Sequence, residues 1–200
     1  MVTVDNGISA AEEIEYAKSL GIDTVVTDHH LPSNKLPDAV AVVDAHLPQC
    51  QTEFRDYAGV GIAYMLVCAL ERVPCEEMLE RYGDLAALGT VADMVPLVSE
   101  NRMLVKEGLK VLNARKRVGL NSLVELTAIG DRKIDEQNIA FTIAPRINAA
   151  GRMGNSMRAF ELLTETDGKK AVELAKEILD ENVLRRETES EITSCAVKQI

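Results

Sequence analysis

The sequence predicts an α/β fold in which a small parallel sheet comes first and helices follow. Short β-branched runs at residues 2–4 and 24–27 flank a helical segment at 9–20, and another short apolar run covers 39–43. Two strand–helix–strand steps of this spacing favour parallel strands joined by right-handed crossovers. The rest of the chain shows helical patterns only. We therefore expect an N-terminal sheet region and a helical remainder.

The first helix carries recognisable signals at both ends. Ser9 is a favoured N-cap residue, Glu12 stands three residues later as in a capping box, and Gly21 follows the last turn. The strand after it is stopped by Leu31-Pro32. Apolar periodicity places the later helices at residues 58–72, 76–94, 101–113, 120–127, 135–143 and 168 to the end.

Composition excludes several classes of protein. The chain has 200 residues, 46% of them hydrophobic and only 4% aromatic, so an aliphatic core of good size is expected. No apolar run approaches the roughly 18–20 residues of a membrane span, and no export signal is visible. Four cysteines without CxxC pairing suggest free thiols in a reducing cytoplasm. Because the net charge is −10, any nucleic-acid contact must rest on a local basic patch.

The two ends suggest a piece of a longer protein. The chain opens on a strand, and it closes inside a mostly charged helical pattern of more than 30 residues that is typical of a connector between domains. We expect three parts: a partial sheet domain over residues 1–113, a helical remainder of the catalytic core over 114–166, and a connector helix over 167–200.

Polar side chains gather where the predicted strands end. Asp28, His29 and His30 follow the strand at 24–27, and Asp5 follows the strand at 2–4. Open α/β sheets bind ligands at the carboxyl ends of their strands. Carboxylate and imidazole groups suit divalent transition metals. The sequence therefore predicts a metal site at this edge of the sheet.

Several segments, all in the same order, resemble the DHH superfamily of phosphoesterases. They are residues 5–9 (DNGIS), 27–30 (TDHH), 87–93 (ALGTVAD) and 144–153 (APRINAAGRM), with 57–61 (YAGVG) and 100–102 (ENR) in support. The segment at 144–153 is similar to one in the family's single-strand-specific 5′-to-3′ DNA exonucleases. The resemblance implies a Rossmann-like DHH domain that is truncated at its N-terminus, because the family's first motif, a pair of aspartates, belongs upstream of Asp5.

The resemblance also implies roles for the metal-site residues. Asp5, His29 and Asp93 become metal ligands, Asp28 orients an imidazole, and His30 faces the scissile phosphate as a catalytic group. The implied cofactor is Mn²⁺, with Mg²⁺ as the other option, and two ions in the complete enzyme.

The segment at 144–153 supplies the implied substrate contacts. Arg146 and Arg152 offer planar donors to phosphate oxygens, and Asn148 can donate to phosphate or sugar. Small residues at 149–151 leave room for a nucleic-acid backbone.

Each of these residues also has a structural explanation. Asp5 and Asp28 are ordinary turn residues at strand ends, Asp93 can cap a helix, and Arg146 can pair with one of many acidic residues. His46, a loop histidine, is left out of the metal set because such residues are commonly only solvated.

The expected function is metal-dependent 5′-to-3′ exonuclease activity on single-stranded DNA in recombination and repair, with little activity from this chain alone. Expected partners are single-stranded DNA, a helicase and a single-strand-binding protein, in the cytoplasm and away from membranes. One alternative is a DHH phosphoesterase acting on oligonucleotides, cyclic dinucleotides or pyrophosphate. Another is a degenerate DHH domain that serves as a scaffold in replication or repair.

Overall fold

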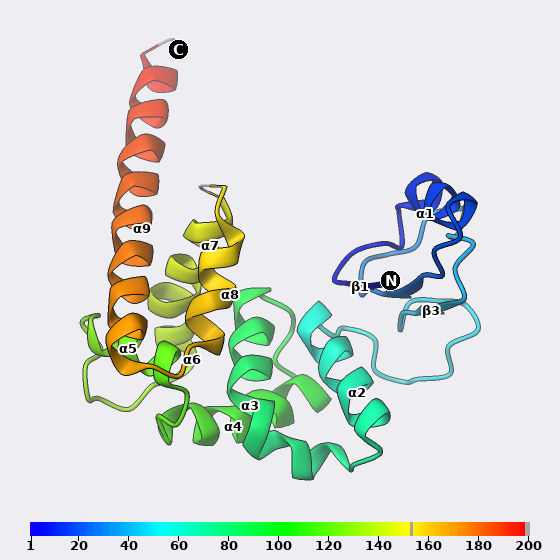
Figure 1. Ribbon diagram of the computed structural model, residues 1–200, viewed down its shortest axis with the longest axis horizontal. Coiled ribbons are helices and arrows are strands. Elements are labelled where there is room, and N and C mark those ends of the chain that lie inside the picture. Colours follow the sequence, from blue (N-terminus) through cyan, green and yellow to red (C-terminus); the bar gives the residue numbers. More distant parts are fainter. Residues whose placement is uncertain (153, 199–200) are drawn as a thin grey trace. The chain divides into compact units, whose positions relative to one another are not determined.

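The computed structural model of the chain describes residues 1–152 and 154–198. The chain divides into two compact units, Met1–Val111 and Leu112–Ile200, which we call the sheet unit and the helical unit. Figure 1 shows their elements. The division into parts at 1–113, 114–166 and 167–200 stays a prediction, and residues 199–200 of its last part lie outside the described residues.

The sheet unit begins with the predicted parallel sheet. Strands β1 (Val2–Val4), β2 (Val25–Thr27) and β3 (Ala41–Val43) pair in parallel in the order β1-β2-β3. Helix α1 (Ala11–Ser19) joins β1 to β2. The predicted second helical crossover is wrong, because residues 28–40 contain no helix. That connection is short and carries two prolines, which cannot continue a helix. The carboxyl ends of the three strands thus lie at one edge.

The prediction of Ser9 as the N-cap of α1 is also wrong. The capping position is Ala10, which makes no side-chain cap, and Ser9 lies in the preceding turn. The turn is closed by a bond from Ala10 N–H to the Gly7 carbonyl, so the helix starts later than the Ser-x-x-Glu pattern indicates. At the other end Gly21, with φ 75°, follows the helix as predicted.

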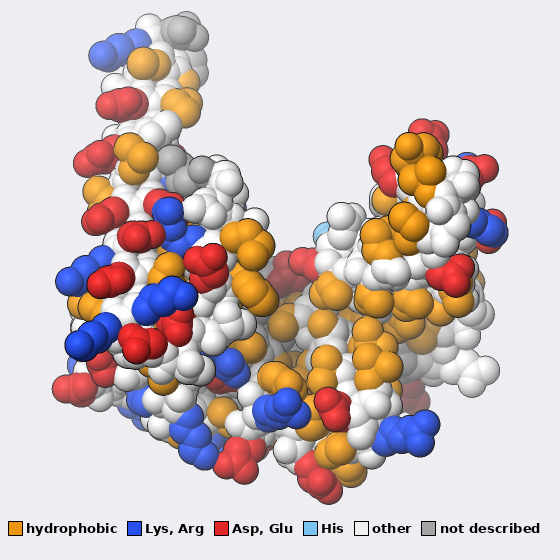
Figure 2. Space-filling model, in the orientation of Figure 1, with side chains coloured by type: hydrophobic (Ala, Val, Ile, Leu, Met, Phe, Trp, Pro, Cys, Tyr) orange, Lys and Arg blue, Asp and Glu red, His pale blue; other side chains and the backbone are white. Residues whose placement is uncertain are grey.

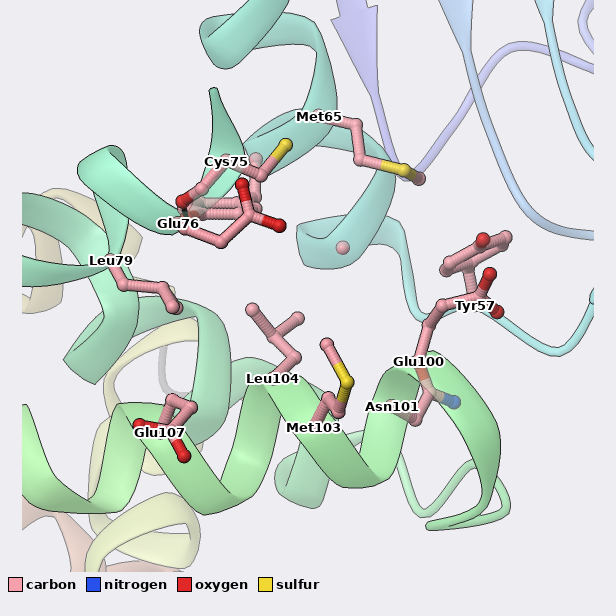
Figure 3. Close-up of a pocket in the computed structure, with 12 residues that line it drawn as sticks. Tyr57, Met65, Cys75, Glu76, Leu79, Glu100, Asn101, Met103, Leu104 and Glu107 are labelled. Atoms are coloured by element: carbon pink, nitrogen blue, oxygen red, sulfur yellow. Dashed lines mark hydrogen bonds between the residues drawn. The ribbon is translucent and has the colours of Figure 1, made fainter. Parts of the chain in front are cut away.

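Three helices follow the sheet close to the predicted ranges: α2 (Gly59–Glu71), α3 (Cys75–Ala92) and α4 (Ser99–Asn113), whose last two residues belong to the helical unit. Small residues bring them close together. A Cβ added to Gly89 of α3 would lie 2.7 Å from the Val60 side chain of α2, and one added to Gly108 of α4 would lie 2.2 Å from the Gly83 carbonyl of α3. The three helices and Tyr57 line a mainly apolar cavity of about 240 Å³ that is partly open to solvent (Figure 3).

The helical unit contains α5 (Val118–Glu125), α6 (Glu136–Asn138), the π-helix η1 (Ile139–Ile143), α7 (Ala144–Arg152), α8 (Ser156–Thr164) and α9 (Gly168–Val197). The helix predicted at 135–143 is divided between α6 and η1, and α7 and α8 were not predicted. Asp135 and Asn138 form a reciprocal capping box at the start of α6.

The long helix α9 has two different halves. Its first half packs against α5, α7 and α8 and buries Ala171, Leu174, Ala175 and Ile178. Beyond Asn182 its residues are largely exposed, and Figure 2 shows charged side chains of both signs along this helix. Within the described part of the chain, no helix combines the length and apolar character needed to cross a bilayer. The four cysteines are free thiols, as expected.

Candidate metal centre

The end of β1 folds into a tight turn that places Asp5 at the sheet edge. Asp5 has φ 57°, and its N–H donates to the Thr27 carbonyl of β2 at 3.0 Å. Gly7 follows with φ 116°, and a Cβ there would lie 2.6 Å from Thr3 Oγ1 and 3.0 Å from Val26. Glycine is therefore required by both the backbone conformation and the available space. The turn leaves the Asp5 side chain 56% exposed.

Asp28 holds the two strand-end loops together. Its Oδ2 accepts from the Ile8 N–H at 2.9 Å, and its Oδ1 accepts from the N–H groups of His29 and His30 at 2.8 and 3.3 Å. Oδ1 also lies 2.7 Å from His30 Nδ1. Asp28 is 1% exposed and its oxygens are already engaged, so its geometry suits orientation of a neighbour better than metal ligation.

The two histidines face the same region because the chain turns around the Asp28 carboxylate. Their ring centroids are 4.4 Å apart and the rings are tilted by 50°. The side chain of His29 is 12% exposed, whereas that of His30 is 59% exposed. His29 therefore points into the protein, and His30 stands at the open side of the site.

Asp93 reaches the same place from the end of α3. It occupies the C-cap position of that helix, and its Oδ2 lies 3.6 Å from His29 Nε2. Asp5 Oδ1 approaches the same nitrogen to 2.9 Å. In addition, single ligand atoms of Asp5, Asp28, His29 and His30 all lie within 4.8 Å of one another. The structure thus brings together all five residues predicted for the metal centre.

The environment of His29 Nε2 tests whether a metal fits this site. The atom is buried, and it makes no hydrogen bond to any described residue, although two carboxylate oxygens lie near it. The 2.9 Å approach of Asp5 has the distance of a hydrogen bond but not its direction. A buried ring nitrogen left in this way is costly unless another group completes its surroundings. A cation between the imidazole and the two carboxylates satisfies all three groups.

The electrostatics of the Asp28–His30 pair follow from these contacts. Burial alone raises the pKa of Asp28, but the hydrogen bonds from Ile8, the His30 ring and the two following amides outweigh it, so this pKa lies below its usual value. The hydrogen bond to Asp28 raises the pKa of His30, and the neighbouring charges of Asp5 and Asp93 add to that effect.

Gly59 is part of the site that sequence reasoning did not assign. A Cβ at this first residue of α2 would lie 2.5 Å from Asp5 Cβ and 2.6 Å from Asp5 Oδ1. The N-terminus of α2 therefore lies directly against the Asp5 side chain, and only glycine leaves room for it there. The sequence signal for this close approach is a glycine at the start of an otherwise apolar helix, because glycine is unfavourable in helices unless packing requires it.

The predicted substrate contacts lie in the helical unit, on α7. Asn148 and Arg152 are exposed and one helical turn apart. Arg146 is half-buried, and its guanidinium donates to the Thr142 carbonyl at 2.5 Å in η1. Its Nε is buried without a hydrogen-bond partner among the described residues, and burial together with the nearby Arg186 lowers its pKa. Met153, the last residue of the predicted segment, lies outside the described residues.

Comparison with known proteins agrees with this geometry. The model of the DHH family, N-terminal domain, matches residues 1–90. Residues 1–90 are thus similar to the N-terminal domain of the DHH family. Over 200 residues the chain is 40% identical to the single-stranded-DNA-specific exonuclease RecJ of Bacillus subtilis (strain 168), and the match includes every residue of this chain.

Two solved structures resemble this chain over 99% of its residues. One is a crystal structure of exonuclease RecJ bound to manganese, with a TM-score of 0.86 and 39% identity. The other is RecJ from Thermus thermophilus in complex with Mn²⁺, with a TM-score of 0.84 and 37% identity. The chain covers 25% of the B. subtilis protein and 50% and 30% of the two crystallised chains. The α/β fold with a parallel sheet is thus confirmed.

Proposed function

We propose that this chain supplies the metal centre and part of the substrate surface of a 5′-to-3′ exonuclease that hydrolyses phosphodiester bonds in single-stranded DNA. The observation that carries the proposal is the buried Nε2 of His29, which has no hydrogen bond to the described residues and faces two carboxylates. The similarity to RecJ structures bound to manganese supports it.

Asp5, His29 and Asp93 are the proposed ligands, with Mn²⁺ as the preferred ion, Mg²⁺ as the other option, and two ions in the complete enzyme. When bound, such ions hold the attacking water and neutralise charge on the phosphate. The three side chains come from the ends of β1, β2 and α3. Each is therefore fixed by an element with its own packing, as a precise ligand set requires.

His30 is the proposed proton carrier to the leaving oxygen, and Asp28 is the residue that orients it. Because Asp28 Oδ1 engages His30 Nδ1 at 2.7 Å, the ring is fixed and Nε2 is left for the substrate. The exposure of the His30 side chain leaves it open to a phosphate from solvent. A side chain that transfers a proton must lie within hydrogen-bond distance of the substrate atom that receives it.

Arg146, Asn148 and Arg152 are the proposed contacts to the DNA backbone. Arg152 and Asn148 are exposed to an approaching strand. Arg146 has a buried Nε without a partner among the described residues and a second arginine, Arg186, close by. A bound anion would accept a hydrogen bond from the Arg146 Nε and would offset the repulsion between the Arg146 and Arg186 charges. A helicase, a single-strand-binding protein and a cytoplasmic location remain predictions from the family resemblance.

The test is to incubate the protein that carries this sequence with Mn²⁺ and a 5′-labelled single strand, a matched duplex and a dinucleotide. The proposal predicts rapid release of mononucleotides from the single strand only, and loss of that activity in the Asp93→Ala variant. Faster hydrolysis of the dinucleotide would instead indicate a DHH phosphoesterase for small substrates. Unchanged manganese affinity in Asp93→Ala would favour a scaffold.

A further inference from the structure

Asn101 lies in the first turn of α4 and is completely buried, with 0% exposure. Its side-chain amide makes two contacts to loops: Nδ2 donates to the Asp56 carbonyl at 2.6 Å and to the Pro96 carbonyl at 3.0 Å. Both acceptors belong to irregular segments, where backbone carbonyls have no helix or sheet partner of their own. One amide therefore ties two loops to the start of a helix.

The loop that contains Pro96 begins at Asp93, the C-cap residue of α3. Pro96 is three residues beyond this carboxylate, in a segment that contains Met94 at φ 59° and leads into Ser99, the first residue of α4, at φ 46°. Left-handed backbone is unfavourable for residues with a side chain, and it persists only where surrounding contacts enforce it. The bond from Asn101 to Pro96 is such a contact. It fixes the path of the chain immediately after the proposed metal ligand.

The loop that contains Asp56 leads into α2, the helix whose first residue lies against Asp5. Asp56 is three residues before Gly59, the residue whose added Cβ would lie 2.5 Å from Asp5 Cβ. Tyr57 and Glu100 are neighbours at the same junction, where burial, the charge of Glu100 and a hydrogen bond to it raise the pKa of the Tyr57 phenol. Figure 3 shows Tyr57, Glu100 and Asn101 together at one end of the cavity.

We propose that Asn101 is a positioning residue for the metal centre, one that sets the separation of Asp93 and Asp5 without touching the metal. The proposal rests on the function proposed above, because it takes these two carboxylates as ligands. Groups that orient ligands from outside the coordination shell commonly change metal affinity by about 10–100-fold when removed. The loss of Asn101 is therefore expected to weaken Mn²⁺ binding, beyond any effect on folding.

The chain offers a matched control on the same helix. Asn113, at the other end of α4, donates from Nδ2 to the Ile134 carbonyl at 2.9 Å and accepts from the Ile134 N–H at 2.8 Å. Asn113→Ala thus removes a similar double contact to a loop, but that loop carries no proposed metal ligand. Asn101→Asp keeps the shape of the side chain and removes the donor.

The experiment measures Mn²⁺ affinity by electron paramagnetic resonance and thermal unfolding by circular dichroism, for the chain and each variant. We expect Asn101→Ala and Asn101→Asp to weaken Mn²⁺ binding about tenfold or more, and Asn113→Ala to leave it within about twofold at a comparable loss of Tm. Unchanged affinity in the Asn101 variants would overturn the proposal.

Two further measurements keep the outcome decisive. If Asn101→Ala is unfolded at the assay temperature, Asn101→Ser is measured in its place, and an affinity equal to that of the unaltered chain would again refute the proposal. His29→Ala is titrated in parallel. Equal Mn²⁺ binding by His29→Ala and the unaltered chain would show that the proposed metal centre itself is wrong, which is a different failure from that of Asn101.

Discussion

Replacement of Asp28 by alanine tests how the strand-end loops are held. The Asp28 carboxylate accepts three backbone N–H groups, from Ile8, His29 and His30, and it also engages the His30 ring. Of the three amides, that of Ile8 lies at a residue only 1% exposed, so it cannot turn to water when the acceptor is lost.

The magnitude follows from these contacts. A buried donor left without a partner costs about 1–3 kcal/mol, and the partly buried amides of His29 and His30 each lose a charge-assisted bond worth about 1.5–3 kcal/mol that water replaces in part. Relief from burying the carboxylate offsets some of this loss. We expect Asp28→Ala to lower the free energy of unfolding by about 3 kcal/mol, a fall in Tm of about 6–12 °C for a chain of this size.

The assay is urea denaturation followed by circular dichroism, with Asp38→Ala as the control. Asp38 is also an aspartate in a salt bridge, to Lys18, but its side chain is 74% exposed. Removal of such a surface pair changes stability by less than about 1 kcal/mol. If Asp28→Ala destabilises the chain no more than Asp38→Ala does, the carboxylate is not what holds the two loops together.

Three other predictions concern separate parts of the chain. Gly59→Ala should weaken Mn²⁺ binding about tenfold or more, measured by calorimetry, because its Cβ would collide with Asp5, whereas Gly61→Ala, whose nearest added contact is 3.7 Å, should leave it unchanged. The Lys170 ion pair and nearby backbone N–H groups lower the pKa of Glu165 to about 2 from an ordinary 4.5, so its contribution to stability is present at pH 7 and is lost as the pH falls from about 5 to 2. The Tm difference between the chain and Glu165→Gln should shrink over that range, and a difference that stays constant would contradict this. The purified 200-residue chain should bind Mn²⁺ weakly and digest single-stranded DNA poorly, and rapid metal-dependent digestion would refute that expectation.

Local patterns were enough to predict the sheet edge and its ligand candidates. Asp5 and the Asp28–His30 segment directly follow β-branched runs, so their position at strand ends depends only on neighbours in sequence. Most helices of the sheet unit were also predicted within two residues, because apolar periodicity and terminal glycines are local signals. The prediction that Asp93 lies beside His29 depended on the family resemblance, because 64 residues separate them in the sequence.

What could not be predicted depends on contacts between distant segments. Gly59 and Asn101 matter because α2 and α4 approach particular loops, and no spacing rule places those loops. The wrong N-cap at Ser9 has the same origin, since the turn at Gly7 is set by packing against Thr3 and Val26 of the sheet. Periodicity also failed around residue 143, where a π-helix shifts the phase of the helical pattern before α7.

The central claim is that His29, with Asp5 and Asp93, binds a divalent metal. A titration of Mn²⁺ into the chain and its His29→Gln variant, followed by electron paramagnetic resonance, tests it most directly, since glutamine keeps a polar side chain and removes the buried ring nitrogen. We expect saturable binding by the chain and an affinity at least about tenfold weaker in the variant. Identical isotherms for the two proteins would contradict the metal centre described above.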